Sequence, residues 1–195
     1  MILDWTPPTL ETDRLVLRPI IPADAPAVFL YCSNPAVTRY TLFETHQSLD
    51  DARWFAGEFT RSRYVSREPD PFGMVLKTDP LRTVVGCLGA HWASQPNLTM
   101  EFGYSLAEPF WGRGLVAEAA GAVLRYVFEE YAVERVQARV FVGNDASERV
   151  LQKLGFTREG VLRSLILRRG RWWDIVMYSL LRAEWERRQT PARPG

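Results

Sequence analysis

The sequence predicts an α+β fold built on a mixed, mostly antiparallel sheet of about seven strands, with helices on both faces. Seven short segments carry apolar side chains at alternate positions or in short runs bounded by turn residues, which is typical of strands. Four segments carry apolar residues at the three- and four-residue spacing of a helix. Turns at Asp79-Pro80 and Arg169-Gly170-Arg171 indicate that neighbouring strands pair as hairpins.

These elements follow one another in a definite order along the chain. We expect strands at Leu10–Pro19, Phe72–Lys77, Thr83–Trp92, Leu98–Ala107, Val133–Val142, Leu162–Arg168 and Trp172–Leu181. We expect helices at Asp24–Ser33, Ser48–Arg63, Val116–Tyr131 and Asn144–Leu154. Asp24 and Ser48 can cap the helices that they begin, and Gly155 suits the left-handed residue that ends the last one.

The composition sets broad limits on organisation and location. We expect an arm over residues 1–9, a single domain over residues 10–188 and a flexible tail over residues 189–195. The formal net charge of +1 argues neither for nor against a polyanionic partner. No long apolar run or basic-then-apolar leader is present, which predicts a cytoplasmic protein without a membrane partner. The two cysteines and two histidines are isolated, so we expect reduced thiols and no metal site.

The stretch Glu101–Glu130 gives the main functional signal. It joins an alternating strand, a Pro-Phe-Trp-Gly-Arg-Gly turn and a helical pattern. A helix that begins at such a loop presents unpaired main-chain N–H groups at the positive end of its dipole, which favours anion binding. Gly112 and Gly114 have no Cβ to keep a pyrophosphate away from the main chain. The dinucleotide and P-loop fingerprints do not fit the run, and a purely structural turn is the alternative.

Several runs of the sequence resemble one family. The run Trp-Gly-Arg-Gly-Leu-Val, residues 111–116, is similar to the pyrophosphate loop of the GNAT acetyltransferase superfamily, and its Trp-Gly-Arg-Gly form resembles the Rim-type branch, which acetylates ribosomal-protein N-termini. Residues 144–156, with Asn-x-x-Ser and Lys-Leu-Gly-Phe, resemble the superfamily's second coenzyme A element. The opening LETDRLVLRPI and the closing GRWWDIVMYSLL are also similar to Rim-type members, so the resemblance covers Leu10 to Trp185.

The resemblance implies a GNAT-like fold and acetyl-CoA as co-substrate. The residues that it implies for acetyl-CoA binding are Phe102, Gly103, Trp111, Gly112, Arg113, Gly114, Leu115, Val116, Asn144 and Ser147. In this interpretation the loop and Arg113 hold the pyrophosphate, and Asn144 hydrogen-bonds the pantetheine arm. The main chain near residues 102–104 would supply the donors that stabilise the oxyanion.

Two side chains are candidates for proton transfer. Glu101 lies within a predicted strand beside the loop, on the face opposite the apolar ladder, and the resemblance implies a general base there, acting through a water. A surface or ion-paired glutamate is the alternative. Ser147 is the candidate general acid, and its alternative role is to cap a helix. The reaction can proceed without an acid, because a thiolate with a pKa of about 8.5 is a tolerable leaving group.

The acceptor is the least defined part of the prediction. Tyr40 and Phe43 lie in an aromatic loop that borders the acceptor pocket in the family, although a packed loop is the alternative. Arginines crowd the last hairpin, where we weigh a solvated surface against contact with an acidic acceptor, a nucleotide phosphate or RNA, at Arg163, Arg168, Arg169 and Arg171. Nucleic acid is not the expected partner. The aromatic-rich composition makes a homodimer our expectation.

Together, these features predict an N-acetyltransferase that uses acetyl-CoA and acts on a protein N-terminal α-amine. Two alternatives remain open within the sequence. One is an enzyme that acylates a small amine, such as an aminoglycoside or a polyamine, or that transfers a longer group such as succinyl. The other is a module that binds acyl-CoA without turnover.

Overall fold

The computed structural model describes residues 5–189, so part of the predicted arm and most of the predicted tail lie outside the described residues. Residues 5–9 form neither helix nor strand, although Pro7 is buried and the Trp5 ring meets the Tyr64 ring edge-on at 6.3 Å. Gln189, the first residue of the predicted tail, is the last residue of helix α7, Arg182–Gln189.

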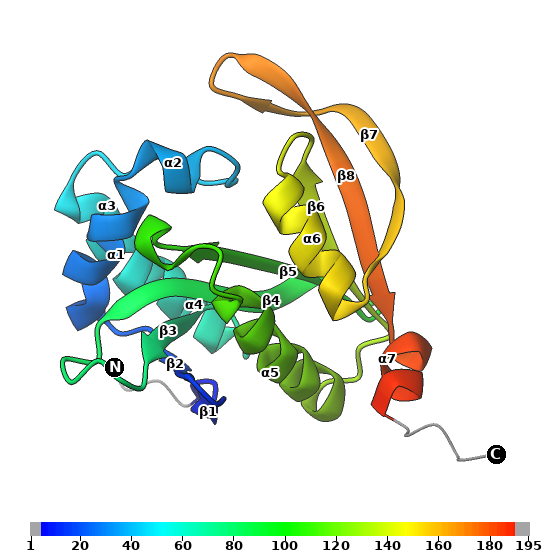
Figure 1. Cartoon of the computed structure of the whole chain (residues 1–195), viewed down its shortest axis with the longest axis horizontal. Coiled ribbons are helices and arrows are strands. Elements are labelled where there is room, and N and C mark those ends of the chain that lie inside the picture. Colours follow the sequence, from blue (N-terminus) through cyan, green and yellow to red (C-terminus); the bar gives the residue numbers. More distant parts are fainter. Residues whose placement is uncertain (1–4, 190–195) are drawn as a thin grey trace. The chain divides into compact units, whose positions relative to one another are not determined.

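The chain divides into two compact units. One consists of Met1–His91 and Gly103–Arg125, and the other of Trp92–Phe102 and Tyr126–Gly195. Three elements continue from one unit into the other along the chain (Figure 1): strands β4 (Val84–Ser94) and β5 (Thr99–Leu106) and helix α5 (Leu115–Glu130). The single domain over residues 10–188 stays a prediction.

Among residues 5–189, eight strands are hydrogen-bonded in the order β1-β2-β3-β4-β5-β6-β8-β7. Strands β5 and β6 pair in parallel, whereas β1–β2, β2–β3, β3–β4, β6–β8 and β7–β8 are antiparallel. The strands span Leu10–Glu11 (β1), Leu15–Pro19 (β2), Phe72–Leu76 (β3), Val84–Ser94 (β4), Thr99–Leu106 (β5), Arg135–Phe141 (β6), Thr157–Arg168 (β7) and Arg171–Leu181 (β8). The predicted α+β class with a mixed, mostly antiparallel sheet is therefore confirmed.

The extra strand arises at the start of the chain, where we predicted one strand over Leu10–Pro19. A turn divides this segment, because the Thr12 main-chain N–H donates to the Leu15 carbonyl at 3.0 Å and the Leu15 N–H donates to the Thr12 hydroxyl at 3.0 Å. Leu10 then pairs with Leu17 in an antiparallel ladder. A threonine side chain that can bond to its own backbone makes such a turn, and alternation alone does not reveal it.

The first unit carries several short helical segments, of which one confirms the helix predicted over Asp24–Ser33 and three take the place of the continuous helix predicted over Ser48–Arg63. They are η1 (Pro22–Asp24), α1 (Ala25–Cys32), α2 (Pro35–Thr38), α3 (Leu49–Trp54), η2 (Phe55–Phe59), α4 (Thr60–Val65) and η3 (Glu108–Phe110). Segment η2 is a π-helix that interrupts the predicted helix over Ser48–Arg63, and the Thr60 hydroxyl donates to the Phe55 carbonyl at 2.8 Å. Buried Val28, Ala52 and Ala56 pack in one cluster with Val16 and Val75 of the strands.

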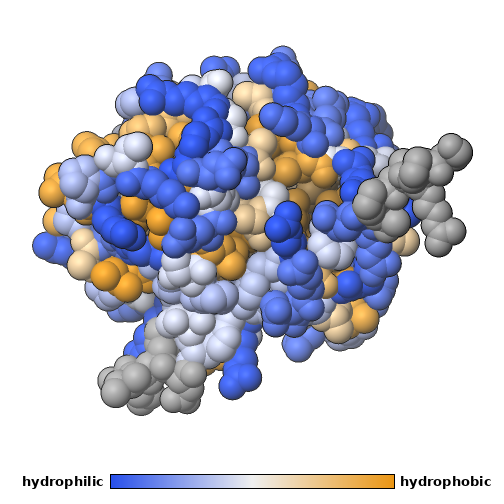
Figure 2. All heavy atoms as spheres, turned by 60° about the horizontal axis from the view of Figure 1, so that its bottom comes forward, coloured by the Kyte–Doolittle hydropathy of each residue, from blue (hydrophilic) through white to orange (hydrophobic). Residues whose placement is uncertain are grey.

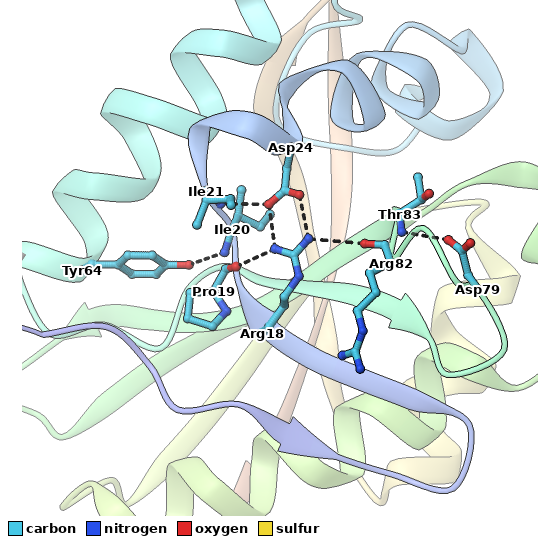
Figure 3. Close-up of polar contacts among 9 residues, drawn as sticks. All are labelled: Arg18, Pro19, Ile20, Ile21, Asp24, Tyr64, Asp79, Arg82 and Thr83. Carbon is cyan, nitrogen blue, oxygen red and sulfur yellow. Dashed lines mark hydrogen bonds and ion pairs between the residues drawn. The ribbon is translucent and has the colours of Figure 1, made fainter.

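An ion pair ties the end of β2 to the start of α1 (Figure 3). The Arg18 guanidinium donates to both carboxylate oxygens of Asp24, at 2.7 and 2.8 Å, and the same carboxylate accepts the Ile21 N–H at 2.9 Å. The Tyr64 hydroxyl accepts the Ile20 N–H at 2.9 Å. Asp24 thus holds the turn before α1 in place, while its side chain makes no cap bond to α1 itself.

The second unit contains α6 (Asp145–Leu154) and α7 beside strands β6, β7 and β8 (Figure 1). The buried Tyr178 of β8 donates its hydroxyl proton to Glu148 of α6 at 2.6 Å. Arg182, the first residue of α7, donates to the carbonyls of Phe128, Tyr131 and Val133 at 2.8 to 2.9 Å. This guanidinium satisfies main-chain acceptors at and after the end of α5, Leu115–Glu130, where a cation also suits the helix dipole.

Two further differences from the predicted elements lie in this unit. Strand β7 begins at Thr157, five residues before the predicted Leu162, and its register shifts twice. Helix α7 was not predicted from the sequence, because its residues show no apolar stripe. No helix among residues 5–189 is long and apolar enough to cross a membrane. On the face drawn in Figure 2, apolar residues gather in several patches bordered by hydrophilic ones.

Candidate active site

The predicted pyrophosphate loop connects β5 to α5 in the first unit. Segment η3 follows β5, and Trp111 leads from it into the glycines. The Trp111 indole N–H donates to the Leu106 carbonyl at 2.7 Å, although the side chain remains exposed. Trp111 therefore fixes the start of the loop to the end of the strand that precedes it.

Both loop glycines have a backbone conformation that favours glycine. The φ angles are +73° at Gly112 and +74° at Gly114. A Cβ at Gly112 would meet no atom within 4 Å, and one at Gly114 would meet only Arg14, at 3.7 Å. The glycines are thus required by their dihedral angles rather than by crowding, and they leave the main chain of the loop open to an approaching ligand.

A set of contacts that the sequence did not reveal anchors this loop. Glu118, in the first turn of α5, accepts hydrogen bonds from the Thr12 hydroxyl, from the Arg14 main-chain N–H at 2.9 Å and from the Arg14 guanidinium at 2.6 Å. Arg14 also donates to the carbonyl of Arg113 at 2.9 Å. Burial acts to raise the pKa of Glu118, but the hydrogen bonds from Thr12 and Arg14 outweigh it and hold the pKa below its ordinary value. The turn between β1 and β2 therefore holds both the loop and the start of α5.

The start of α5 has the chemistry of an anion site. The helix is 16 residues long. Leu115 and Val116 at its first positions are buried, so the packing of their side chains holds the main chain of this turn in place. The Arg113 side chain is exposed and its guanidinium lies over the Phe110 ring, 5.4 Å from the centroid. The helix dipole and the guanidinium both favour negative charge at this end.

Glu101 lies in the second unit, on the part of β5 that pairs with β6. Its residue is only 6% exposed, and Arg139 donates to its Oε1 from Nε at 2.8 Å and from Nη2 at 2.6 Å. Gln137 donates to Oε2 at 3.1 Å. The ion pair that we considered as the alternative for Glu101 is therefore present. It joins residues 38 positions apart in the chain, so no local pattern announced it.

Phe102 and Gly103 follow the last residue pair of the parallel ladder, which runs from Thr99–Arg135 to Glu101–Gln137. Phe102 is buried, and its ring centroid lies 6.5 Å from that of Phe156. Gly103 is exposed. The predicted oxyanion donors are thus main-chain groups just beyond a paired segment of β5.

Asn144 and Ser147 lie together at the start of α6. Asn144 is the N-cap, and its Oδ1 accepts the Ser147 main-chain N–H at 3.3 Å. The cap that we considered for Ser147 is therefore supplied by Asn144, and Ser147 lies inside the first turn. The Nδ2 group of Asn144 makes no hydrogen bond to any residue of the described part of the chain.

The aromatic loop after α2 belongs to the first unit. The Arg39 guanidinium lies over the Tyr40 ring at 5.0 Å, and the Phe43 ring lies 6.0 Å from that of His46. The Thr41 hydroxyl bonds to the carbonyls of Thr38 and Phe43, at 3.1 and 2.9 Å. Tyr40 and Phe43 thus stand in a loop with internal contacts, and their role toward an acceptor stays a prediction.

The histidines and cysteines form no metal cluster within residues 5–189. Burial lowers the pKa of His46, which Asp51 acts to raise. The His91 Nδ1 lies 3.6 Å from Asp70. Both cysteines are free thiols, as predicted.

Comparison with known proteins identifies the family. Residues 14–157 match the family model described as the acetyltransferase (GNAT) domain. This match includes the loop, Glu101 and the start of α6. The chain belongs to the GNAT acetyltransferase family, and it is an N-acetyltransferase.

Two relatives and one solved structure are similar to this chain. The uncharacterized N-acetyltransferase YoaA of Bacillus subtilis is 34% identical over 175 residues, which cover 90% of this chain and 97% of that protein. The [ribosomal protein uS5]-alanine N-acetyltransferase of Escherichia coli is 34% identical over 91 residues, 47% of this chain and 45% of that protein. The solved structure of RimL, a ribosomal L7/L12 α-N-protein acetyltransferase in complex with coenzyme A, is 19% identical with a TM-score of 0.79, and the match covers 89% of this chain and 98% of RimL. The RimL structure supports the fold.

Proposed function

We propose that this N-acetyltransferase takes acetyl-CoA as donor and the N-terminal α-amine of a protein as acceptor. The observation that carries the proposal is the glycine loop at the start of α5, which Arg14 fixes from outside the helix through its bonds to Glu118 and to the Arg113 carbonyl. A loop held in this way can bind a pyrophosphate without reorganising, which lowers the entropic cost of binding. The coenzyme A in the RimL structure and the ribosomal substrate named for the Escherichia coli relative support the donor and the acceptor.

We assign the donor to two groups of residues. The main chain of Gly112–Val116 and the Arg113 guanidinium hold the pyrophosphate, and Trp111 fixes the loop. Asn144 hydrogen-bonds the pantetheine arm through Nδ2, because its Oδ1 is committed to the cap. The main chain of Phe102 and Gly103 donates to the carbonyl oxygen as negative charge develops there.

Glu101 is the proposed general base. Arg139 occupies Oε1 with two hydrogen bonds, so Oε2, which accepts one bond from Gln137, is the oxygen that receives the proton through a water. The amine nitrogen then attacks the thioester carbon, the carbon–sulfur bond breaks, and the thiolate leaves. Ser147 is the proposed donor of a proton to that thiolate.

Two aromatic side chains are proposed to recognise the acceptor. Tyr40 and Phe43 carry the aromatic surface of the loop after α2 that we propose for contact with the first acceptor residues. The remaining alternatives are acylation of a small amine, transfer of a longer acyl group such as succinyl, and acyl-CoA binding without turnover. A homodimer and a cytoplasmic location stay predictions.

Release of the coenzyme A thiol tests this function. Acetyl-CoA and succinyl-CoA would each be offered with peptides that begin with Ala or Ser, with the same peptides blocked at the N-terminus, and with a polyamine and an aminoglycoside. We expect turnover with acetyl-CoA on free N-termini only. Turnover on blocked peptides or on small amines alone would contradict the acceptor assignment.

Variants separate donor binding from catalysis. Gly112→Glu should abolish acetyl-CoA binding, because it places a carboxylate and a strained φ in the loop. Gly121→Glu is the matched control, since Gly121 is an exposed residue of the same helix with nothing within 4 Å of a Cβ. Glu101→Gln should lower kcat by about a hundredfold or more while leaving acetyl-CoA binding intact. Binding without turnover on any amine would support the non-catalytic module.

A further inference from the structure

The hairpin of β7 and β8 carries an apolar face that the rest of the chain leaves exposed. Leu165, Leu167 and Trp172, here called the hairpin face, are 43%, 60% and 61% exposed. Leu167 and Trp172 are partners in the antiparallel register, so their side chains point to the same side, and Leu165 lies two residues before Leu167. On the other side, the Trp173 ring packs edge-on against Phe141 at 5.3 Å. One side of the hairpin therefore stabilises the second unit, and the hairpin face does not.

Positive charge is concentrated in the same hairpin. Residues 163–172 contain four arginines and no acidic residue. Arg163, Arg169 and Arg171 are exposed. Within residues 5–189, no carboxylate lies within ion-pair distance of Arg163 or Arg171, and Arg171 instead lies 3.4 Å over the Trp173 ring, on the side opposite the hairpin face. A hairpin with an apolar face and exposed guanidinium groups suits a partner with apolar residues and carboxylates.

The hairpin is held in a fixed shape. Arg169 and Gly170 form its turn with φ of +51° and +72°, as a two-residue hairpin loop requires. The register shifts between Leu162 and Ile166, where Ser164 has a φ of +48° and donates its N–H to Asp174 at 2.7 Å. In Figure 1 the tip extends past the ends of β6 and α6. A surface shaped in advance loses little entropy when a partner binds.

Strand β7 is also the last strand in the sheet order, so one of its edges can accept a further strand. We propose that an acidic, extended segment of the acceptor protein docks along the β7 edge. Its apolar side chains would lie on the hairpin face, and its alternate carboxylates would reach Arg171 on the opposite side and Arg163 at the register shift. Main-chain hydrogen bonds along the edge would supply affinity, and the alternating apolar and acidic side chains would supply specificity. This inference rests on the proposed protein acceptor.

Charge and shape favour the acidic protein segment over two other occupants, a second copy of the chain and an RNA strand. A second copy of the chain that paired along β7 would bring Arg163 and Arg168 of the two strands together, which is unfavourable. An RNA strand would gain from the arginines and from a base stacked on Trp172, but Leu165 and Leu167 offer neither a hydrogen bond to phosphate nor a ring. The aliphatic half of the face therefore favours an acidic protein segment.

Fluorescence anisotropy tests the docking surface without any turnover. The probes are a short labelled peptide of alternating Asp and Val, the same peptide with Lys for Asp, and a labelled single-stranded oligo(U). The full chain would be compared with Arg163→Glu/Arg171→Glu and with Leu167→Ser/Trp172→Ser. The matched control is Arg125→Glu/Leu30→Ser, which changes an exposed arginine and a leucine that is 77% exposed, both outside the hairpin.

We expect the acidic peptide alone to bind, more weakly at high ionic strength. Each hairpin variant should bind it at least about tenfold more weakly, and the control should bind like wild type. Unchanged affinity in the hairpin variants would overturn the proposal. So would preferential binding of oligo(U), or a dimer in sedimentation that the hairpin variants abolish.

Turnover distinguishes a failure of this inference from a failure of the proposed function. With the Asp-Val segment placed behind a free N-terminus that the enzyme acetylates, KM should fall relative to a neutral segment, kcat should stay the same, and the hairpin variants should remove the gain. If no N-terminus is acetylated but hairpin-dependent binding persists, the acceptor assignment fails and the docking surface stands. If N-termini are acetylated equally well with the Asp-Val segment and with the neutral segment, the docking proposal is wrong and the proposed function stands.

Discussion

The two helices that carry the proposed acetyl-CoA residues begin in different ways. α5 follows two glycines with positive φ, and Glu118 in its first turn is bonded to Thr12 and Arg14, more than a hundred residues away in the chain. α6 begins with a local cap, in which Asn144 accepts the Ser147 N–H. A side-chain cap accepts one of the main-chain N–H groups in the first turn, which a bound anion could otherwise use. A helix start that binds an anion is therefore better held by residues outside the helix. The comparison shows how tertiary contacts can replace a cap.

Breaking the external anchor should have the largest effect. Glu118→Gln removes the charge that holds Thr12 and Arg14, and we expect a loss of about 2 kcal/mol in the free energy of unfolding, since hydrogen bonds to charged groups contribute about 1.5–3 kcal/mol each. The KM for acetyl-CoA should rise as the loop loosens. Denaturant unfolding and steady-state kinetics measure the two effects. Arg53→Ala, in an exposed pair with Asp50, is the control, and equal losses in both variants would contradict the anchor.

Changing the glycine geometry should have a somewhat smaller effect. Gly114→Ala forces a Cβ into a φ of +74°, at an expected cost of about 1–2 kcal/mol. Gly121→Ala, within the same helix, should instead stabilise by about 0.5–1 kcal/mol, because alanine loses less backbone entropy. Thermal unfolding of the pair gives the sign of each change. Stabilisation by both substitutions would mean that the loop does not need its left-handed glycine.

The cap of α6 should contribute less to the free energy of unfolding than the Glu118 contacts that anchor α5. Asn144→Ala should cost about 1 kcal/mol through loss of the cap. Asn144→Asp keeps an acceptor oxygen but removes the Nδ2 donors, so it should leave stability near wild type and still raise the KM for acetyl-CoA. Kinetics and unfolding on both variants separate the two roles of this side chain. An aspartate variant with unchanged KM would remove Asn144 from the proposed donor site.

Acid should weaken the contacts that hold the start of α5 and leave the cap of α6 unchanged. The pKa of Glu118 is lower in the folded chain than in the unfolded chain, so its contribution to stability is full above the ordinary glutamate pKa of about 4.3 and is lost as the pH falls through the folded value. The stability difference between wild type and Glu118→Gln should therefore shrink below about pH 4. The difference between wild type and Asn144→Ala should stay constant, because this cap does not titrate. A parallel shrinkage of both differences would argue against the assignment.

Local signals in the sequence predicted much of the fold and the site. The stripe of α5 is buried where the spacing placed it, at Val123, Val127 and Phe128 among others, and Gly155 ends α6 with a φ of +91°. Where a side chain bonded to nearby backbone, periodicity was a poorer guide. The Thr12 turn divided the first strand, and the π-helix at Phe55–Phe59 interrupted a helix that the apolar spacing had joined.

The sequence by itself determined the order of most strands and of the longer helices, the GNAT resemblance that the family match later confirmed, and the glycines and the cap that begin α5 and α6. Each of these depends on residues within a few positions of one another, whose dihedral preferences and side-chain reach are local properties. Only the tertiary structure decided that Glu101 is paired with Arg139 and that Glu118 holds Arg14. Those pairs form because the strands and helices bring distant residues together, and charges of either sign occur all along the chain, so the sequence alone does not say which will meet.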